Sequence, residues 1–217
     1  MIKGIIFDMD GVLVDNRDIH IEAFRIFSRR HGVTLNEDGF METFGRGNDE
    51  IIPSIWPREL YENKDMNALS QEKEVIYRDL FRDRIEPTKG LVAFIDEVKR
   101  RGYKLAVGSS GPEANVRFVL EKCGIADKFD AVVHSGLVTR CKPAPDIYLL
   151  ASELLGFKPE ECLVIEDAPP GIESAHLAGC HVAVLATTFP RSRFADEKYD
   201  LISDNFIDFD TDGIAKI

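Results

Sequence analysis

Short apolar runs alternate with amphipathic segments throughout the chain after Pro87. The apolar runs have the length and composition of β-strands, and the segments between them have the periodicity of helices. This alternation predicts parallel βαβ units, and therefore an α/β fold in which a sheet lies between two layers of helices. The predicted strands are 104–108, 131–133, 162–165 and 181–185, and the predicted helices are 91–99, 113–122, 145–155 and 171–178.

The part of the chain before Pro87 has a different character. Residues 2–7 form one more apolar, strand-like run, which stops at an acidic loop containing Gly11. From about Asn16 to Arg84 the sequence has helical periodicity and almost no strand signal. We therefore expect a helical insertion between the first strand and the rest of the sheet.

Polar residues follow the predicted strands in four loops. In a parallel sheet, ligands bind beyond the carboxyl ends of the strands, where loops from different strands converge. The first loop carries Asp8 and Asp10, and the two-residue period of an extended chain can direct both to the same side. Two close carboxylates repel each other, so the pair indicates either Mg2+ or a coupled acid and base. The alternative is a solvated turn, because Asp and Gly are common in turns.

The second and third loops add a hydroxyl group and a cation. Ser109, Ser110 and Gly111 lie between a strand and a helix, where a hydroxyl beside backbone N–H groups suits an anion. The alternative is an ordinary serine cap on that helix. In the third loop, Pro143 keeps Lys142 out of helical geometry, so that Lys142 can offer its charge to phosphate. The alternative for Lys142 is a surface lysine that precedes a helix.

The fourth loop places Glu166 and Asp167 directly after the apolar run 162–165. Carboxylate oxygens are hard ligands, and they could complete a Mg2+ site that Asp8 and Asp10 begin. Capping of the next helix by Asp167 is the alternative, and the two roles can coexist. The agreement among four loops is stronger evidence for a site than any single motif.

Taken in this order, the four motifs resemble those of the haloacid dehalogenase superfamily. The resemblance is strongest to the branch with a helical cap, which includes β-phosphoglucomutase and phosphoglycolate phosphatase. It implies a three-layer, Rossmann-like core made of residues 1–15 and 85–217, with an inserted α-helical cap domain made of residues 16–84. It also implies a Mg2+-dependent phosphatase that hydrolyses a small phosphorylated metabolite through an aspartyl-phosphate intermediate.

Carried over position by position, the resemblance makes Asp8 the nucleophile and Asp10 the general acid and base. The serine of the second loop would bind the transferring phosphoryl group, and the lysine of the third would neutralise charge around it. The groups implied to contact the substrate in the core are Ser109, Ser110, Gly111 and Lys142. The implied ligands of Mg2+ are Asp8, Asp10, Asp167 and Glu166.

The predicted cap contributes three further candidates for substrate binding. Asn16 and His20 lie where the mutases that the chain resembles have cap-linked groups that gate the residue equivalent to Asp10. Arg46 lies in the loop that would face the core. At the place where those mutases have an arginine that grips phosphate, however, this chain has Asn48. A sugar phosphate mutase is therefore the second choice after a phosphatase.

Other functions fit the sequence less well. A dehalogenase of the same superfamily normally lacks the acid found here at Asp10. A non-catalytic phosphoacceptor or phosphate-binding domain also uses strand-end aspartates, a hydroxyl and a lysine. Such signalling domains are far shorter, however, and they have no helical insertion after the first strand. The cap therefore favours an enzyme.

Charge and hydropathy restrict the partners. A net charge of −11 disfavours nucleic acid and anionic lipid, since both are bound through Lys and Arg. No apolar run approaches the ~18 residues of a membrane span, and no basic and apolar leader follows Met1. We therefore expect a cytoplasmic enzyme that acts on a small-molecule phosphate ester. The sequence predicts neither the oligomeric state nor the leaving group.

Overall fold

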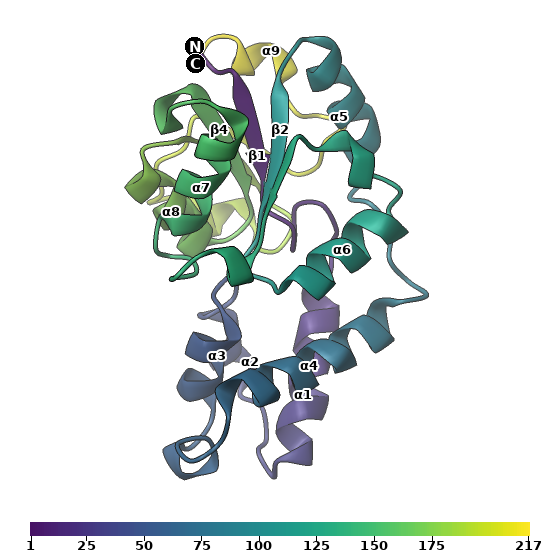
Figure 1. Ribbon diagram of the computed structural model, residues 1–217, viewed down its shortest axis with the longest axis vertical. Helices are drawn as coiled ribbons and strands as arrows, with labels where there is room; N and C mark the ends of the chain where they lie inside the picture. Colours follow the sequence, from purple (N-terminus) through teal and green to yellow (C-terminus); the bar gives the residue numbers. More distant parts are fainter.

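The computed structural model describes residues 1–217, which form two lobes (Figure 1). One lobe contains a six-stranded parallel sheet in the order β3-β2-β1-β4-β5-β6. The chain moves outwards from β1 to β3 and then returns to β4 on the other side of β1, which opens a crevice at the carboxyl ends of β1 and β4. The strands are β1 Gly4–Phe7, β2 Lys104–Gly108, β3 Ala131–Val133, β4 Cys162–Glu166, β5 His181–Leu185 and β6 Leu201–Ser203.

Helices cover both faces of this sheet (Figure 1). Side chains alternate along β1, so that Ile5 and Phe7 pack in the core shared with α5 and α6, whereas Ile6 packs in a second core with α7 and α8. The expected three-layer, Rossmann-like α/β fold is therefore confirmed. The helices of this lobe are α5 Leu91–Arg100, α6 Glu113–Lys122, α7 Asp146–Leu155, α8 Pro169–Ala178 and α9 Thr211–Ile214. Short 3-10 turns lie at Ala126–Lys128, Ser135–Leu137, Pro159–Glu161 and Arg191–Phe194.

The predicted boundaries agree with the structure to within two residues. Strands β2, β3 and β5 and helix α6 begin and end where the sequence predicts. Helix α8 begins two residues early, at Pro169, because proline suits the first turn of a helix. Strand β6 and helix α9 were not predicted, since segments of three and four residues are too short to show a periodic pattern.

The second lobe is entirely helical. Helices α1 and α4 pack along each other, and Ala23, Phe24 and Phe27 of α1 have the spacing of a single buried face. The indole Nε1 of Trp56 donates a hydrogen bond to Ser28 Oγ at 2.9 Å, and its ring stacks on Phe27, so Trp56 belongs to the core of this lobe. The helices are α1 Arg17–Arg30, α2 Glu37–Met41, α3 Asn48–Ile55 and α4 Met66–Phe81, with a 3-10 turn at Arg58–Leu60.

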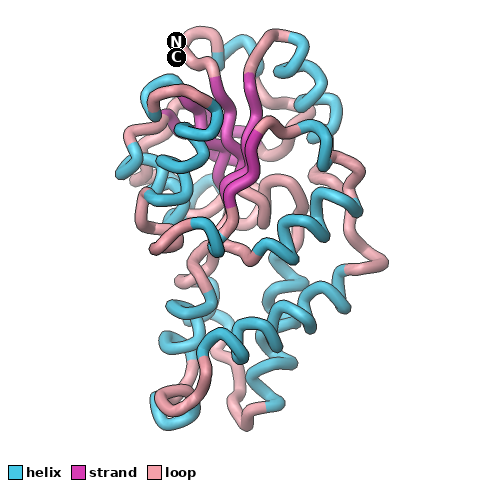
Figure 2. Tube along the Cα trace, in the orientation of Figure 1, coloured by secondary structure: helices cyan, strands magenta, loops and turns pink.

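Two loops, residues 8–16 and 82–90, connect the lobes (Figure 2). They run side by side, because Val14 pairs with Pro87 and the amide of Thr88 donates to the carbonyl of Leu13 at 2.9 Å. The helical lobe is thus attached directly beside the loop that carries Asp8 and Asp10. No helix in the structure combines the length and the apolar character needed to cross a membrane.

Candidate active site

The loop after β1 brings Asp8 to the crevice and turns sharply at Gly11. Gly11 has a φ of 79°, in the left-handed region that favours glycine. A Cβ atom there would lie 1.9 Å from Oδ2 of Asp167, so the turn also allows the loops after β1 and β4 to approach closely. Asn16 fixes the same turn, because its Oδ1 accepts from the amide of Gly11 and its Nδ2 donates to Oδ1 of Asp10 at 2.6 Å.

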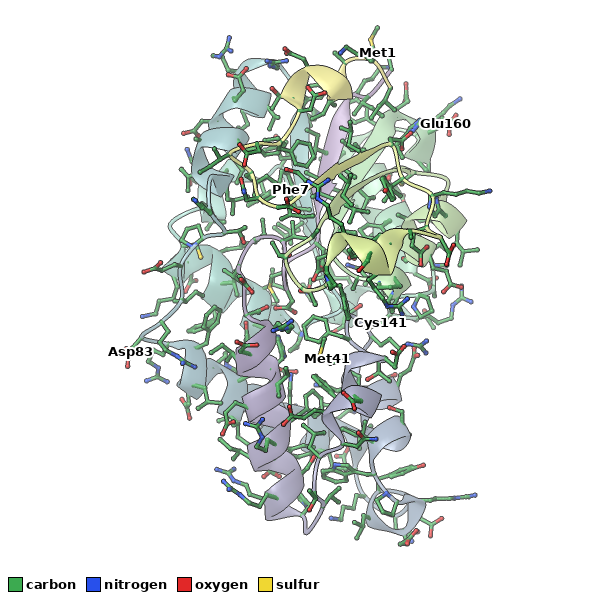
Figure 3. All side chains as sticks on the ribbon, turned by 180° about the vertical axis from the view of Figure 1, so that it is seen from behind. Met1, Phe7, Met41, Asp83, Cys141 and Glu160 are labelled. Carbon is green, nitrogen blue, oxygen red and sulfur yellow. The ribbon has the colours of Figure 1, made fainter.

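Lys142 lies in the crevice and joins two of the four loops. Its Nζ is 2.5 Å from Oδ1 of Asp8 and 2.7 Å from Oε1 of Glu166, and only 1% of its surface is exposed. The ring of Tyr148 lies beneath the ammonium group, and Tyr148 OH donates to the same oxygen of Glu166. Figure 3 shows the neighbouring Cys141 at the level where the two lobes meet, which places this loop between them. Lys142 is therefore a buried cation that contacts the candidate nucleophile.

Glu166 makes four hydrogen bonds, which fix its position. Oε1 accepts from Lys142 and Tyr148, and Oε2 accepts from the backbone amides of Asp167 and Ala168 at 2.9 and 3.2 Å. A Cβ atom at Gly171 would lie 1.7 Å from Oε1, so only glycine leaves room for this carboxylate. These contacts favour a role for Glu166 in positioning Lys142.

Two carboxylates contact that one lysine, and a third lies next to them. Oxygen atoms of Asp8, Glu166 and Asp167 lie within 4.8 Å of one another, and Oδ2 of Asp167 is buried with no hydrogen-bond partner. A buried acceptor without a donor is costly, and clustered carboxylate oxygens are the ligands that Mg2+ prefers. The residues present therefore fit a divalent cation.

The electrostatics of this cluster point the same way. Burial raises the pKa of Asp8 to about 8, with a further rise from the charges of Glu166 and Asp10, although Lys142 opposes both. Burial also raises the pKa of Asp167 well above its ordinary value, assisted by Glu166 and Asp8. The negative charge thus exceeds what one lysine can neutralise, and a cation would relieve it.

Asp10 has a different environment, in which its charged form is favoured. Burial alone would raise the pKa of Asp10, but the facing His20, the amide of Asn16 and the charge of Lys73 lower it. His20 Nε2 lies 3.3 Å from Oδ1 of Asp10, and His20 Nδ1 lies 2.9 Å from Nζ of Lys73. An ammonium group can only donate, so Nδ1 accepts and the ring N–H is on Nε2, on the side of Asp10. The structure thus brings the predicted residues Asn16 and His20 to Asp10.

The serine loop after β2 lies beside Lys142. Ser109 is buried, and its Oγ accepts from the amide of Gly111 at 2.9 Å. Ser110 Oγ accepts from the amide of Lys142 at 3.3 Å. Ser110 and Gly111 line a cavity of about 50 Å³ between the lobes, together with Asp8 and Asp10. The hydroxyl and amide groups of this loop therefore adjoin both the candidate nucleophile and the lysine.

Arg46 also lines this cavity, but it is already paired. Its Nη1 lies 3.1 Å from Oε2 of Glu50, one helical turn away. Asn48 donates to Glu74 Oε1 at 2.6 Å. Neither side chain contacts the core carboxylates, so the loop before α3 and the first residue of α3 form part of the cap wall of the cavity.

The sequence analysis missed three buried polar residues of that cavity: Lys73 and Glu74 in α4, and Asn115 in α6. Lys73 had a detectable signal. It follows Leu69 by four residues and precedes Tyr77 by four, so it occupies the apolar face of the helix. A lysine at such a position requires a partner, which here is Glu74 at 2.9 Å.

Comparison with known proteins adds independent findings. A family model described as haloacid dehalogenase-like hydrolase matches residues 2–179. The chain is 34% identical over 179 residues to fructose-1-phosphate phosphatase YqaB of Escherichia coli, covering 81% of this chain and 92% of that protein. It is 30% identical over 210 residues to SUPPRESSOR OF QUENCHING 1, chloroplastic, of Arabidopsis thaliana, which covers 94% of this chain and only 20% of that protein. Among solved structures, β-phosphoglucomutase from Clostridium difficile matches with a TM-score of 0.85 and 25% identity, covering 100% of this chain and 96% of that one.

Proposed function

This chain belongs to the haloacid dehalogenase-like hydrolase family and is a phosphatase, and we propose that it uses Mg2+ to hydrolyse a small phosphorylated metabolite through an aspartyl phosphate on Asp8. The observation that carries the proposal is the cluster of Asp8, Lys142 and Asp167, with Asp10 on the same loop. It combines a nucleophile, a buried cation, an acceptor without a donor, and an acid or base.

The first half-reaction would transfer the phosphoryl group to Asp8. A phosphate dianion repels an attacking carboxylate until nearby positive groups offset its charge. Lys142 and the N–H groups of the serine loop would do so from the protein side. When bound by Asp8, Asp167 and the carbonyl of Asp10, with Glu166 adjacent, Mg2+ would neutralise further charge and align the phosphoryl group.

Asp10 would serve both half-reactions. In the first, it donates a proton to the oxygen of the leaving group, and a phosphoryl dianion beside it would raise its pKa towards the protonated form. In the second, it takes a proton from the water that cleaves the acyl phosphate. The lowered pKa of Asp10 suits this second role, since a base must be unprotonated.

We propose that residues 16–84 act as a cap domain over a core of residues 1–15 and 85–217. The cavity lies between the two lobes and takes side chains from both. Closure would exclude water from the acyl phosphate until the leaving group has departed. Because only the two loops 8–16 and 82–90 join the lobes, the proposed hinges lie within them, near Asp15 and at residues 84–88.

A sugar phosphate mutase is the second candidate, because the β-phosphoglucomutase structure covers the whole chain. The geometry supports it less than a phosphatase. Asn48 is uncharged and contacts Glu74, and Arg46 contacts Glu50 through Nη1, so a second phosphate would have to compete with Glu50 for the one nearby arginine.

A phosphate-release assay with p-nitrophenyl phosphate, with and without Mg2+, tests the proposed function. Metal-dependent release is expected, together with an acid-stable phosphoenzyme that is lost in Asp8→Asn. Glucose 1-phosphate should be offered in parallel, with glucose 6-phosphate measured as product. Isomerisation faster than hydrolysis would favour the mutase, and absence of both activities would refute the proposal.

A further inference from the structure

A buried carboxylate that the proposed chemistry does not use, Glu74, lies in the cap wall of the cavity that also contains Asp8 and Asp10. We propose that Glu74, Asn48 and Asn115 form a leaving-group site that binds the hydroxyl groups of an uncharged leaving group and rejects one that carries a second anionic group. This inference rests on the proposed phosphatase function and specifies its substrate class as monophosphates of neutral, polyhydroxylated compounds.

The hydrogen bonds of Glu74 leave it one free acceptor position. Oε1 accepts from Asn48 Nδ2 at 2.6 Å and from Lys73 Nζ at 2.9 Å, while Oε2 accepts from Asn115 Nδ2 at 2.6 Å. A carboxylate oxygen can accept two hydrogen bonds, so Oε2 can still accept one. A hydroxyl group is the donor that fits there, because it brings no charge into a buried site.

The charges around the cavity oppose a second anion. Glu74 stays ionised: burial alone would raise its pKa, but Lys73 and His20 lower it. The two cationic side chains of the cap wall, Lys73 and Arg46, each contact a carboxylate, and the Nε of Arg46 is buried without a hydrogen-bond partner. A phosphate or carboxylate on the far end of the substrate would therefore have to compete with Glu74 for Lys73, or with Glu50 for Arg46, whereas a hydroxyl group would not.

Both lobes contribute to this site, so it is complete only when they meet. Asn115 belongs to α6 of the core, where it is 1% exposed, and it donates to Glu74 of α4. The guanidinium of Arg78, also in α4, donates to Oδ1 of Asn115 at 2.6 Å and so orients its amide. Figure 1 shows α4 reaching towards α6. The selectivity would therefore act in the closed enzyme, next to the reacting groups.

Two matched pairs of substrates test the inference with the full chain and saturating Mg2+. Fructose 1-phosphate and fructose 1,6-bisphosphate differ by one phosphate, and glycerol 3-phosphate and 3-phosphoglycerate differ by one carboxylate. We expect kcat/KM to favour the member with a single anionic group by about 100-fold in the first pair and about 10-fold in the second. Glu74→Gln should reduce the ratio of kcat/KM for fructose 1-phosphate to kcat/KM for fructose 1,6-bisphosphate by about 10-fold. It should also raise KM for fructose 1-phosphate.

Glu72→Gln is the matched control, since it makes the same change in the same helix. Glu72 contacts His31 and Arg30, outside the cavity, so both ratios should stay unchanged. If Glu74→Gln does not fold, Asn48→Lys supplies a cation at the same place and should also narrow the first ratio. Its position is only partly buried, which leaves room for the longer side chain.

The outcomes separate this inference from the function on which it rests. Hydrolysis of p-nitrophenyl phosphate together with equal or faster hydrolysis of the bisphosphate and of 3-phosphoglycerate would overturn the leaving-group site and leave the phosphatase standing. Unchanged ratios in folded Glu74→Gln, or in Asn48→Lys, would also overturn it. Absence of Mg2+-dependent hydrolysis of every substrate would overturn the proposed function, and the inference with it.

Discussion

The molecule contains two buried clusters of lysine and carboxylate, one at the edge of the sheet and one in the cap, and they are balanced differently. At the sheet edge, Lys142 contacts two carboxylates, a third lies within 4.8 Å of both, and the pKa values of Asp8 and Asp167 are raised. In the cap, Lys73 faces the single carboxylate of Glu74, whose pKa is lowered.

The difference shows how burial can serve two purposes. The cap cluster is neutral as a pair and satisfied by amide donors, so it can stand without further ligands and present a fixed surface. The sheet-edge cluster has more carboxylates than its lysine can neutralise, so it must bind either protons, as the raised pKa values of Asp8 and Asp167 indicate, or an added cation. Each of the following predictions tests this contrast.

The largest expected effect is at the nucleophile. Asp8→Asn should reduce kcat by about 10⁴-fold or more, because no acyl phosphate can form on an amide. Steady-state phosphate release and trapping of the phosphoenzyme measure this. Near-normal turnover in the variant would show that Asp8 is not the nucleophile and that the sheet-edge carboxylates have another role.

Asp10→Asn should slow catalysis by about 10²- to 10⁴-fold, since an amide can neither donate nor accept the proton in the required way. The fold should persist, because Asn can keep the hydrogen bond from Asn16. The check is kcat alongside the far-UV circular dichroism spectrum. A loss of structure equal to the loss of activity would contradict a role in proton transfer.

Removing each lysine compares the two clusters directly. Lys142→Met and Lys73→Met should each destabilise the protein by about 3–5 kcal/mol, because each leaves buried carboxylate charge uncompensated. Mg2+ should restore part of the loss in Lys142→Met and none in Lys73→Met. Thermal unfolding with and without Mg2+ tests this, with the exposed Lys158→Met as control. If Mg2+ stabilised both variants equally, the proposal that only the sheet-edge cluster binds the metal would be wrong.

The smallest effect concerns pH. The pKa of Asp8 is about 8 in the folded protein and about 3.9 in the unfolded chain, so between these values the folded protein holds a proton that the unfolded chain has released. This contribution lowers the free energy of unfolding as pH rises from about 4 to about 8. In EDTA, Asp8→Asn should therefore have a higher Tm than wild type, and the difference should grow as the pH rises from about 5 to about 8. Mg2+ should reduce the difference in Tm between Asp8→Asn and wild type. If Mg2+ left this difference unchanged, the carboxylate cluster would not be the Mg2+ site.

Much of the core was predictable because its signals are local. Strand periodicity located β2, β3 and β5, and the ends of parallel strands located Asp8, Asp167 and the serine loop. The sequence could not show that all four acceptor positions of Glu166 are occupied by hydrogen-bond donors. Two of these donors, Lys142 and Tyr148, come from another loop and another helix.

The cap was less predictable, for a physical reason. The position of Lys73 on the apolar face of α4 indicates that it is buried, but Glu74 looks like an ordinary charged residue of a surface helix until α6 covers it. Their partners His20 and Asn115 are 53 and 41 residues away in sequence, beyond any periodic pattern. Patterns within one helix identify which face is buried, whereas the chemistry of that face depends on what packs against it.

The absence of a side chain at Gly171 has a practical consequence for engineering. Any other residue there would push the Glu166 carboxylate aside and release Lys142, although every reacting group would keep its identity. Random mutagenesis should therefore yield inactive clones at this position that are easily mistaken for folding failures. A library meant to change substrate preference should hold Gly171 constant and place its diversity in the loop before α3.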